Sequence, residues 1–218
     1  MFANREEAAE RIAERLSAYR GKRPLVLAVP RGGVPMGALV AERLEGELDV
    51  VLVHKLGAPD NPELAIGAVD EDGHRELTPY AHALHLNPAY VEREAATQLD
   101  VLRRRRSRYT PVRPPIDPEG RIVIVVDDGI ATGATLLAAL RGLRRKRPQR
   151  LIAAVAVAPA ETLERVEAES DEVICLEVPE PFYAVGQFFA DFSEVSDEDV
   201  VASLRAHGGA GTGDSSCV

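Results

Sequence analysis

Two adjacent carboxylates, Asp127 and Asp128, end an apolar run and are followed at once by a loop of small residues in VVDDGIATGAT, residues 125–135. Backbone amides in such a loop can close around an anion, because glycine allows close approach and the next helix points its positive end there. Thr132 and Thr135 add hydroxyl donors. The loop is therefore suited to a phosphate group.

The two carboxylates would repel a phosphate unless the ligand also offers hydroxyl donors, or unless a metal ion lies between the carboxylates and the phosphate. A sugar phosphate meets both conditions, because carboxylates accept hydrogen bonds from ribose hydroxyls and also bind Mg2+. The alternative is that Asp127 and Asp128 only end a strand and cap a helix, while Gly129 and Gly133 make the turn. The complete set of residues favours a ligand site. Neither a Walker loop nor a dinucleotide fingerprint occurs.

A second strand, glycine turn and helix occur in VLAVPRGGVPMGALVAERL, with Arg31 at the turn. Gly32 and Gly33 either allow the backbone to bind an anion or only form the turn. Arg31 either binds the ligand or is a solvated surface charge. Lys55, just past the run VVLVH, is a third positive group at the same edge, although lysine is common at exposed strand ends. A second such turn at the end of a neighbouring strand therefore favours a ligand with two phosphate clusters.

Short runs rich in valine, isoleucine and leucine, without the alternation of a half-exposed strand, indicate buried parallel strands. They cover residues 25–29, 50–53, 122–126 and 151–157. PMGALVAERLEG and ATLLAALRGLRRKRP, which follow the first and third runs, have helical periodicity ended by glycine or proline. A further strand is expected at 172–178, after a helix near 159–169. This order predicts an α/β fold with a doubly wound, mainly parallel sheet and helices on both faces.

A long insertion, about residues 57–120, separates the second and third predicted strands. It holds a hairpin that turns at Asp72-Gly73 and a helix that opens after Asn87 and runs to about Tyr109. Connections of this length usually serve function.

The chain has 218 residues, enough for one domain, placed at 1–206, with a disordered tail of small polar residues at 207–218. Its 26 lysines and arginines against 35 aspartates and glutamates give a net charge of -9, which does not favour nucleic acid or an anionic membrane. The arginines at 103–106 are expected on a solvated helix face near Glu92 and Glu94. Without a signal-peptide or membrane-span pattern, and with two cysteines that match no metal or redox spacing, a cytoplasmic location is expected.

VVDDGIATGAT resembles the phosphoribosyl-pyrophosphate motif of the type I phosphoribosyltransferases, and the likeness extends over about residues 25–192. The resemblance implies that Asp127 and Asp128 hold the ribose hydroxyls. It also implies that Arg31 and the next residue hold pyrophosphate through an unusual cis peptide, and that Lys55 meets the same group. One or two Mg2+ ions would be held mainly by the substrate.

Electrostatic stabilisation then carries the expected reaction, with Asp127, Asp128, Arg31 and Lys55 as the catalytic residues. A mobile cover is expected to exclude water, and the hairpin near residues 66–77 is the candidate. The expected substrate-binding set is Arg31, Gly32, Gly33, Lys55, Asp127, Asp128, Gly129, Ile130, Ala131, Thr132, Gly133, Ala134, Thr135, Phe182, Tyr183 and Val185.

PEPFYAVGQFFADF resembles the hood of the hypoxanthine-guanine branch, which places a small hood at about 179–203. Phe182 or Tyr183 would stack on a planar base, and backbone groups near Val185 would read its edge. Alternatively, the aromatic residues only close a core. Ala131 stands where the 6-oxopurine enzymes carry an aspartate, which argues against that branch and leaves the nucleophile open.

The sequence thus predicts a cytoplasmic, Mg2+-dependent phosphoribosyltransferase and, as in many members of the family, a homodimer. It would move 5-phosphoribosyl from phosphoribosyl pyrophosphate to a nucleobase or related nitrogen nucleophile, with no nucleic-acid or membrane partner. The alternative is a non-catalytic protein of the same fold that senses phosphoribosyl pyrophosphate or a nucleotide.

Overall fold

The computed structural model describes residues 1–78, 81, 84 and 86–208. Its main sheet is parallel and has the strand order β2-β1-β6-β7-β8. These strands are β1 (Leu25–Ala28), β2 (Glu47–Val50), β6 (Ile122–Asp127), β7 (Arg150–Val157) and β8 (Glu172–Glu177). The predicted strands at 25–29, 122–126, 151–157 and 172–178 are present to within one or two residues.

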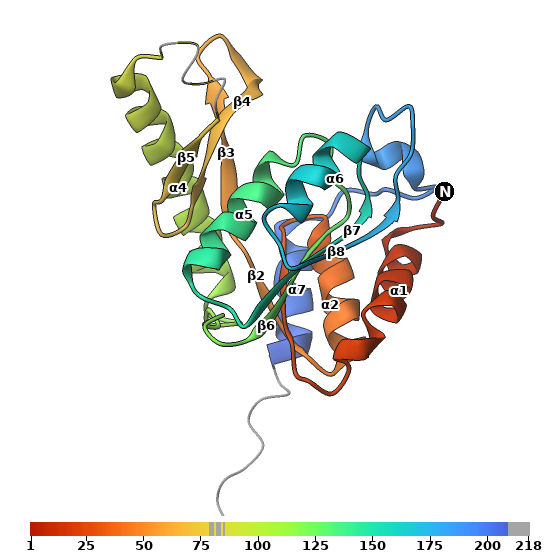
Figure 1. Ribbon diagram of the computed structural model, residues 1–218. Coiled ribbons are helices and arrows are strands. Elements are labelled where there is room, and N and C mark those ends of the chain that lie inside the picture. The colour runs from red at the N-terminus through yellow and green to blue at the C-terminus, as the bar shows by residue number, and fades with distance from the viewer. Residues whose placement is uncertain (79–80, 82–83, 85, 209–218) are drawn as a thin grey trace, which may run out of the picture.

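Helices cover both faces of this sheet, which confirms the doubly wound fold (Figure 1). One face carries α1 (Arg5–Arg15), α2 (Gly33–Leu44) and α7 (Asp197–Gly208), and the other carries α5 (Ala134–Arg145) and α6 (Ala160–Glu167). Successive strand residues alternate between the two cores: Ile124 packs on the first side, and Val123 and Val125 pack on the second. Both faces are apolar, which explains the unbroken apolar runs in the sequence.

The insertion forms a separate antiparallel sheet of β3 (Val53–Ala58), β4 (Asn61–Asp70) and β5 (Arg75–Leu77), followed by α4 (Pro88–Tyr109). The predicted hairpin turn is present, with Gly73 in the left-handed region at φ +85°. The predicted helix start is also present, because the Asn87 side chain accepts a hydrogen bond from the Ala89 amide at 2.9 Å. Figure 1 shows this sheet beside α5, outside the main sheet.

The strand predicted at 50–53 is wrong, because β2 ends at Val50 and the chain then leaves the main sheet. The insertion therefore begins before residue 57. The sequence pattern did not indicate β2, because Asp49 interrupts the apolar run that a buried strand normally shows. Its buried carboxylate accepts hydrogen bonds from the amides of Val50 at 2.7 Å and Ile116 at 2.9 Å.

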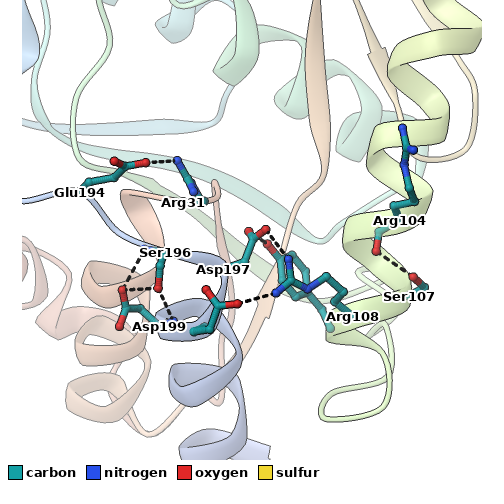
Figure 2. A network of polar contacts seen from close by, with 10 residues as sticks. Arg31, Arg104, Ser107, Arg108, Glu194, Ser196, Asp197 and Asp199 are labelled. Atoms are coloured by element: carbon teal, nitrogen blue, oxygen red, sulfur yellow. Dashed lines mark hydrogen bonds and ion pairs between the residues drawn. The ribbon is translucent and has the colours of Figure 1, made fainter.

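The arginine run on α4 does not form a uniformly solvated face. Arg106 lies 3.2 Å from Asp49 and donates to both carboxylate oxygens of Glu71, at 2.6 and 2.7 Å. Arg108 pairs with Asp197 of α7 at 2.9 Å (Figure 2). These ion pairs fasten α4 to the edge of the main sheet and to α7.

The predicted hood at 179–203 divides into two parts. Its first part contains the short helix η2 (Val185–Phe188), whereas the residues from Asp197 onward belong to α7, which packs against α2 and β2. His207 and Gly208 also belong to α7 and not to the predicted tail, and residues 209–218 lie outside the described residues. None of the helices in the described ranges combines the length and apolar character needed to span a membrane.

Candidate active site

The two predicted ligand loops meet at the point where the strand order reverses. From β1 the chain moves outward to β2 on one side, and from β6 it moves outward to β7 and β8 on the other. Ligands of open α/β sheets bind in the crevice outside the carboxyl ends of the strands at such a point. The loop after β1 and the loop after β6 both lie at this edge of the sheet, and the Val29 amide donates to the Val126 carbonyl at 2.9 Å. We refer to the region outside these strand ends, between the two loops, as the crevice.

The two glycines of the first loop allow it to lie directly against the second. A Cβ atom on Gly33 would lie 2.6 Å from the Val126 carbonyl oxygen, and one on Gly32 would lie 2.0 Å from Oδ2 of Asp128. Both distances are shorter than van der Waals contact. Glycine is therefore required at these positions for close approach of the two loops.

Asp127 and Asp128 lie side by side at the end of β6. Asp127 accepts a hydrogen bond from the Asp128 amide at 2.9 Å. Burial of its carboxyl group and the neighbouring Asp128 carboxylate raise the pKa of Asp127 well above its ordinary value. Burial also raises the pKa of Asp128, and the nearby Arg5 guanidinium opposes that rise.

Arg5 of α1 is a cation of this site that the sequence did not reveal. Its Nε and Nη2 both lie 2.9 Å from Oδ2 of Asp128, and its Nη1 donates to the Ser193 carbonyl at 2.8 Å. The guanidinium carbon lies 3.9 Å from the centre of the Phe192 ring. Arg5 is 123 residues from Asp128 along the chain, so no local spacing signals the pair.

The predicted phosphate loop presents its amides without a competing partner. Within the described part of the chain, no group accepts a hydrogen bond from the amides of residues 131–135. Two loop carbonyls are instead held by α6, because Thr162 donates to Ala131 at 2.7 Å and Arg165 to Thr132 at 3.2 Å. The amides and the α5 amino terminus thus remain able to bind an anion.

The loop after β6 also forms the start of α5 and contributes one side chain to the core. Gly133 has a φ of +69° and caps α5, while Ala134 and Thr135 form the first helical turn. Ile130 is buried in the core between the sheet and α5, so its side chain does not face a ligand. Only its backbone belongs to the loop, and its amide donates to the Val157 carbonyl at 3.0 Å.

Gly129 is required by close packing against the hood. A Cβ atom there would lie 2.6 Å from Cγ1 of Val185 and 2.7 Å from Cγ1 of Val157. The loop after β6 and η2 are therefore in contact. Val185, predicted to lie near a base, packs beside the loop with its side chain partly buried.

Arg31 lies at the first loop and forms an ion pair with Glu194 at 2.6 Å (Figure 2). Glu194 is a second residue that the sequence did not reveal, and it is highly exposed. This loop contains a cis peptide bond that does not precede a proline, between Pro30 and Arg31. A cis peptide in this loop is what the family resemblance implied.

Lys55 does not lie at the carboxyl edge of the main sheet. It occupies the interior of β3 in the small sheet, where it is paired in register with Ala68 of β4. The prediction placed it past the end of a core strand, which was an error inherited from the misplaced strand at 50–53.

The hairpin proposed as a cover lies along α5. Asp70 pairs with Arg145 and Asp72 with Lys146, each at 2.8 Å. Arg145 is the last residue of α5, whereas the phosphate loop precedes its first residue. The tip of the hairpin therefore lies at the far end of α5 from that loop.

The aromatic residues of the hood have two different environments. The rings of Phe182 and Phe188 lie 5.3 Å apart, and those of Phe189 and Phe192 lie 5.0 Å apart. Phe182 thus takes part in closing a core, which was the alternative to base stacking. Tyr183 is 81% exposed and keeps its ring accessible.

The chain is similar to known proteins over most of its length. The chain is 43% identical over 209 residues to Rv0571c and to MT0597 of Mycobacterium tuberculosis, both provisionally named phosphoribosyl transferases. Those 209 residues are 95% of this chain but 47% of each relative, so the chain spans about half their length.

A solved structure and a family model extend the match. The crystal structure of TT1426 from Thermus thermophilus is similar with a TM-score of 0.83 and 50% identity, covering 94% of this chain and 98% of that one. The model of the phosphoribosyl transferase domain matches residues 2–192, which include both loops, the acid pair and Arg5. The chain therefore belongs to the phosphoribosyl transferase domain family.

Proposed function

We propose that the chain transfers 5-phosphoribosyl from phosphoribosyl pyrophosphate to a nitrogen nucleophile and releases pyrophosphate. The observation that carries this proposal is the contact between an acid pair and two anion-suited loops at one crevice. A ribose with a phosphate at one end and a pyrophosphate at the other has matching groups. Its hydroxyls are donors for carboxylates, and its phosphoryl oxygens are acceptors for amides and arginine.

Each end of the proposed substrate has its own set of residues. The amides of residues 131–135, with the hydroxyls of Thr132 and Thr135, bind the 5-phosphate. Asp127 and Asp128 accept hydrogen bonds from the ribose hydroxyls and stabilise positive charge on the ring as pyrophosphate departs. Arg31 and Gly32 bind the pyrophosphate. The Arg31–Glu194 ion pair must then open, and its exposure makes that inexpensive.

The acid pair has the chemistry that Mg2+ prefers, since it offers adjacent carboxylate oxygens. Burial and the neighbouring Asp128 carboxylate raise the pKa of Asp127, and a divalent cation relieves the repulsion between the two carboxylates. Asp127 and Asp128 would hold the ion together with substrate oxygens. When bound, Mg2+ supplies charge neutralisation for the departing pyrophosphate.

The acceptor in this proposal is a planar nitrogen compound that stacks on Tyr183, with backbone groups near Val185 at its edge. Support comes from the exposed Tyr183 ring and from the contact between Val185 and Gly129. Ala131 has no side chain that could take up a proton from the acceptor. A 6-oxopurine is therefore a poor candidate.

Pyrophosphate release from phosphoribosyl pyrophosphate with Mg2+, measured across a panel of nucleobases and amines, tests the proposal. Turnover with one acceptor and not with the others is the expected result. Tight binding without turnover on any acceptor would instead indicate a sensor of the same fold. By family resemblance the proposal includes a cytoplasmic homodimer, and light scattering of the purified chain tests its size.

A further inference from the structure

Arg5 occupies the boundary between the acid pair and the first loop. Its Nη2 would lie 3.3 Å from a Cβ atom on Gly32, in addition to its contact with Asp128. Gly32 belongs to the loop to which the proposed function assigns pyrophosphate. The guanidinium therefore lies between the positions proposed for the ribose hydroxyls and for the leaving group.

The Arg5 side chain is fixed in place before any ligand arrives. The face of its guanidinium lies on Phe192, at 3.9 Å from the ring centre, and Nη1 is held by the Ser193 carbonyl. The backbone just before it is also fixed, because the Phe2 amide donates to Phe188 at 2.7 Å and Ala190 donates to the Phe2 carbonyl at 2.8 Å. Binding an anion there would cost little ordering entropy.

The guanidinium retains donors for a further group. Of its five N–H groups, Nε and one on Nη2 face Asp128, and one on Nη1 donates to Ser193. Among the described residues, no hydrogen-bond acceptor engages the remaining N–H groups. A phosphoryl oxygen placed against Gly32 is the type of acceptor they fit.

The charges around the acid pair lead to the same conclusion. Pyrophosphate carries several negative charges and would lie close to Asp127 and Asp128. Arg5 is the cation that contacts Asp128, so it offsets the repulsion between that carboxylate and the ligand. Asp191 is a further acid near this guanidinium; hydrogen bonds from Ser193 lower its pKa, and the charge of Arg5 adds to that effect.

We propose that Arg5 is a binding residue for the leaving pyrophosphate, donating to it from the acid-pair side of the crevice while Arg31 donates from the other. This inference rests on the proposed function. It extends the ligand-binding set to α1, an element outside both glycine loops.

The chain offers a matched control in Arg11. This residue lies on the same helix, pairs with Glu177 at 3.1 Å and lies 4.9 Å from the Phe2 ring. Arg11→Gln thus removes an ion pair and a ring contact from the same helix, away from the acid pair, at a more exposed position (39% and 44% exposed, against 13% and 12% for Arg5 and Asp128). It controls for the general effect of removing an arginine from α1.

The experiment is calorimetric titration of inorganic pyrophosphate with Mg2+ into the full 218-residue chain at fixed ionic strength. Arg5→Gln is expected to weaken binding about ten- to hundredfold, the usual effect of losing a hydrogen bond to a charged group. Arg11→Gln is expected to bind like the wild type. Unchanged or tighter binding by Arg5→Gln would overturn the inference, because Arg5 would then be structural or a competitor of the ligand.

A second comparison separates direct contact from simple neutralisation of Asp128. The double variant Arg5→Gln/Asp128→Asn is expected to bind more weakly than Asp128→Asn alone. Equal affinity of these two proteins would overturn the inference. Should Arg5→Gln fail to fold, Arg5→Lys replaces it, with weaker binding expected because lysine lacks the planar fork. Absence of binding by the wild type would count against the proposed function itself.

Discussion

The ion pair that anchors α4 to the main sheet gives a prediction whose size follows from the structure. The side chains of Arg106 and Asp49 are 13% and 3% exposed. Arg106→Leu leaves the Asp49 carboxylate buried without its cation. Removal of one partner from a buried pair typically costs about 3–5 kcal/mol. Asp49 keeps two amide donors, from Val50 and Ile116, so we expect the lower end of that range.

Urea denaturation and calorimetry measure this loss. For a chain of this size, about 3 kcal/mol corresponds to a fall in Tm of about 6–12 °C. Arg103→Leu is the control, because Arg103 is exposed and its ion pair with Asp100 has a distance of 3.7 Å. Its stability is expected to stay within about 0.5 kcal/mol of the wild type.

The pH dependence of Arg106→Leu provides an independent check. Burial raises the pKa of Asp49, and Arg106 opposes that rise, so the variant's pKa is higher still. A raised native pKa means that the native state binds the proton more tightly, and stability is lost as pH rises through that pKa. The deficit relative to the wild type should therefore be smaller at pH 4 than at pH 7. A deficit that is equal at both pH values, or no deficit at all, would show that Arg106 does not stabilise the buried Asp49 carboxylate.

Three further predictions concern the crevice. Gly129→Val forces the loop away from Val185 and is expected to cost about 1–3 kcal/mol in urea denaturation, with partial rescue by Val185→Ala; a neutral effect would contradict the contact. Tyr183→Ala should leave Tm unchanged and raise the KM of the acceptor, and an unchanged KM would exclude stacking. Glu194→Gln should tighten pyrophosphate binding a few-fold by releasing Arg31, whereas weaker binding would assign Glu194 a supporting role.

Apolar runs and helical periodicity were sufficient to predict the doubly wound sheet. Both features can be seen within a short stretch of sequence, because a buried parallel strand is apolar at every position. The same pattern failed at β2. Asp49 is tolerated there because Arg106, 57 residues away, pairs with it, and no local window contains that information. The hairpin of β4 and β5 was predicted, but β3 was missed because the strand had been placed at 50–53, and the position of Lys55 was wrong for that reason.

In the candidate site, residues in contiguous motifs could be predicted, whereas residues distant in sequence could not. The acid pair and the glycine turns are contiguous motifs, so their spacing was enough to propose a ligand site there, while the role of each residue came from the family resemblance. Arg5 and Glu194 reach the crevice from opposite ends of the chain, and Glu194 is 163 residues from Arg31. Their types are ordinary for surface residues. Only the folded arrangement gives them partners.

In the proposed function, the acid pair binds the hydroxyls of a ribose whose phosphate lies in the adjacent loop. The most direct test of this binding is the affinity of the wild type for ribose 5-phosphate compared with 2-deoxyribose 5-phosphate, measured with Mg2+. We predict tighter binding of ribose 5-phosphate by about tenfold, as expected for a hydrogen bond to a carboxylate. The preference should disappear in Asp127→Asn/Asp128→Asn. Equal affinities in the wild type, or a preference that survives in the variant, would show that Asp127 and Asp128 do not bind the ribose hydroxyls.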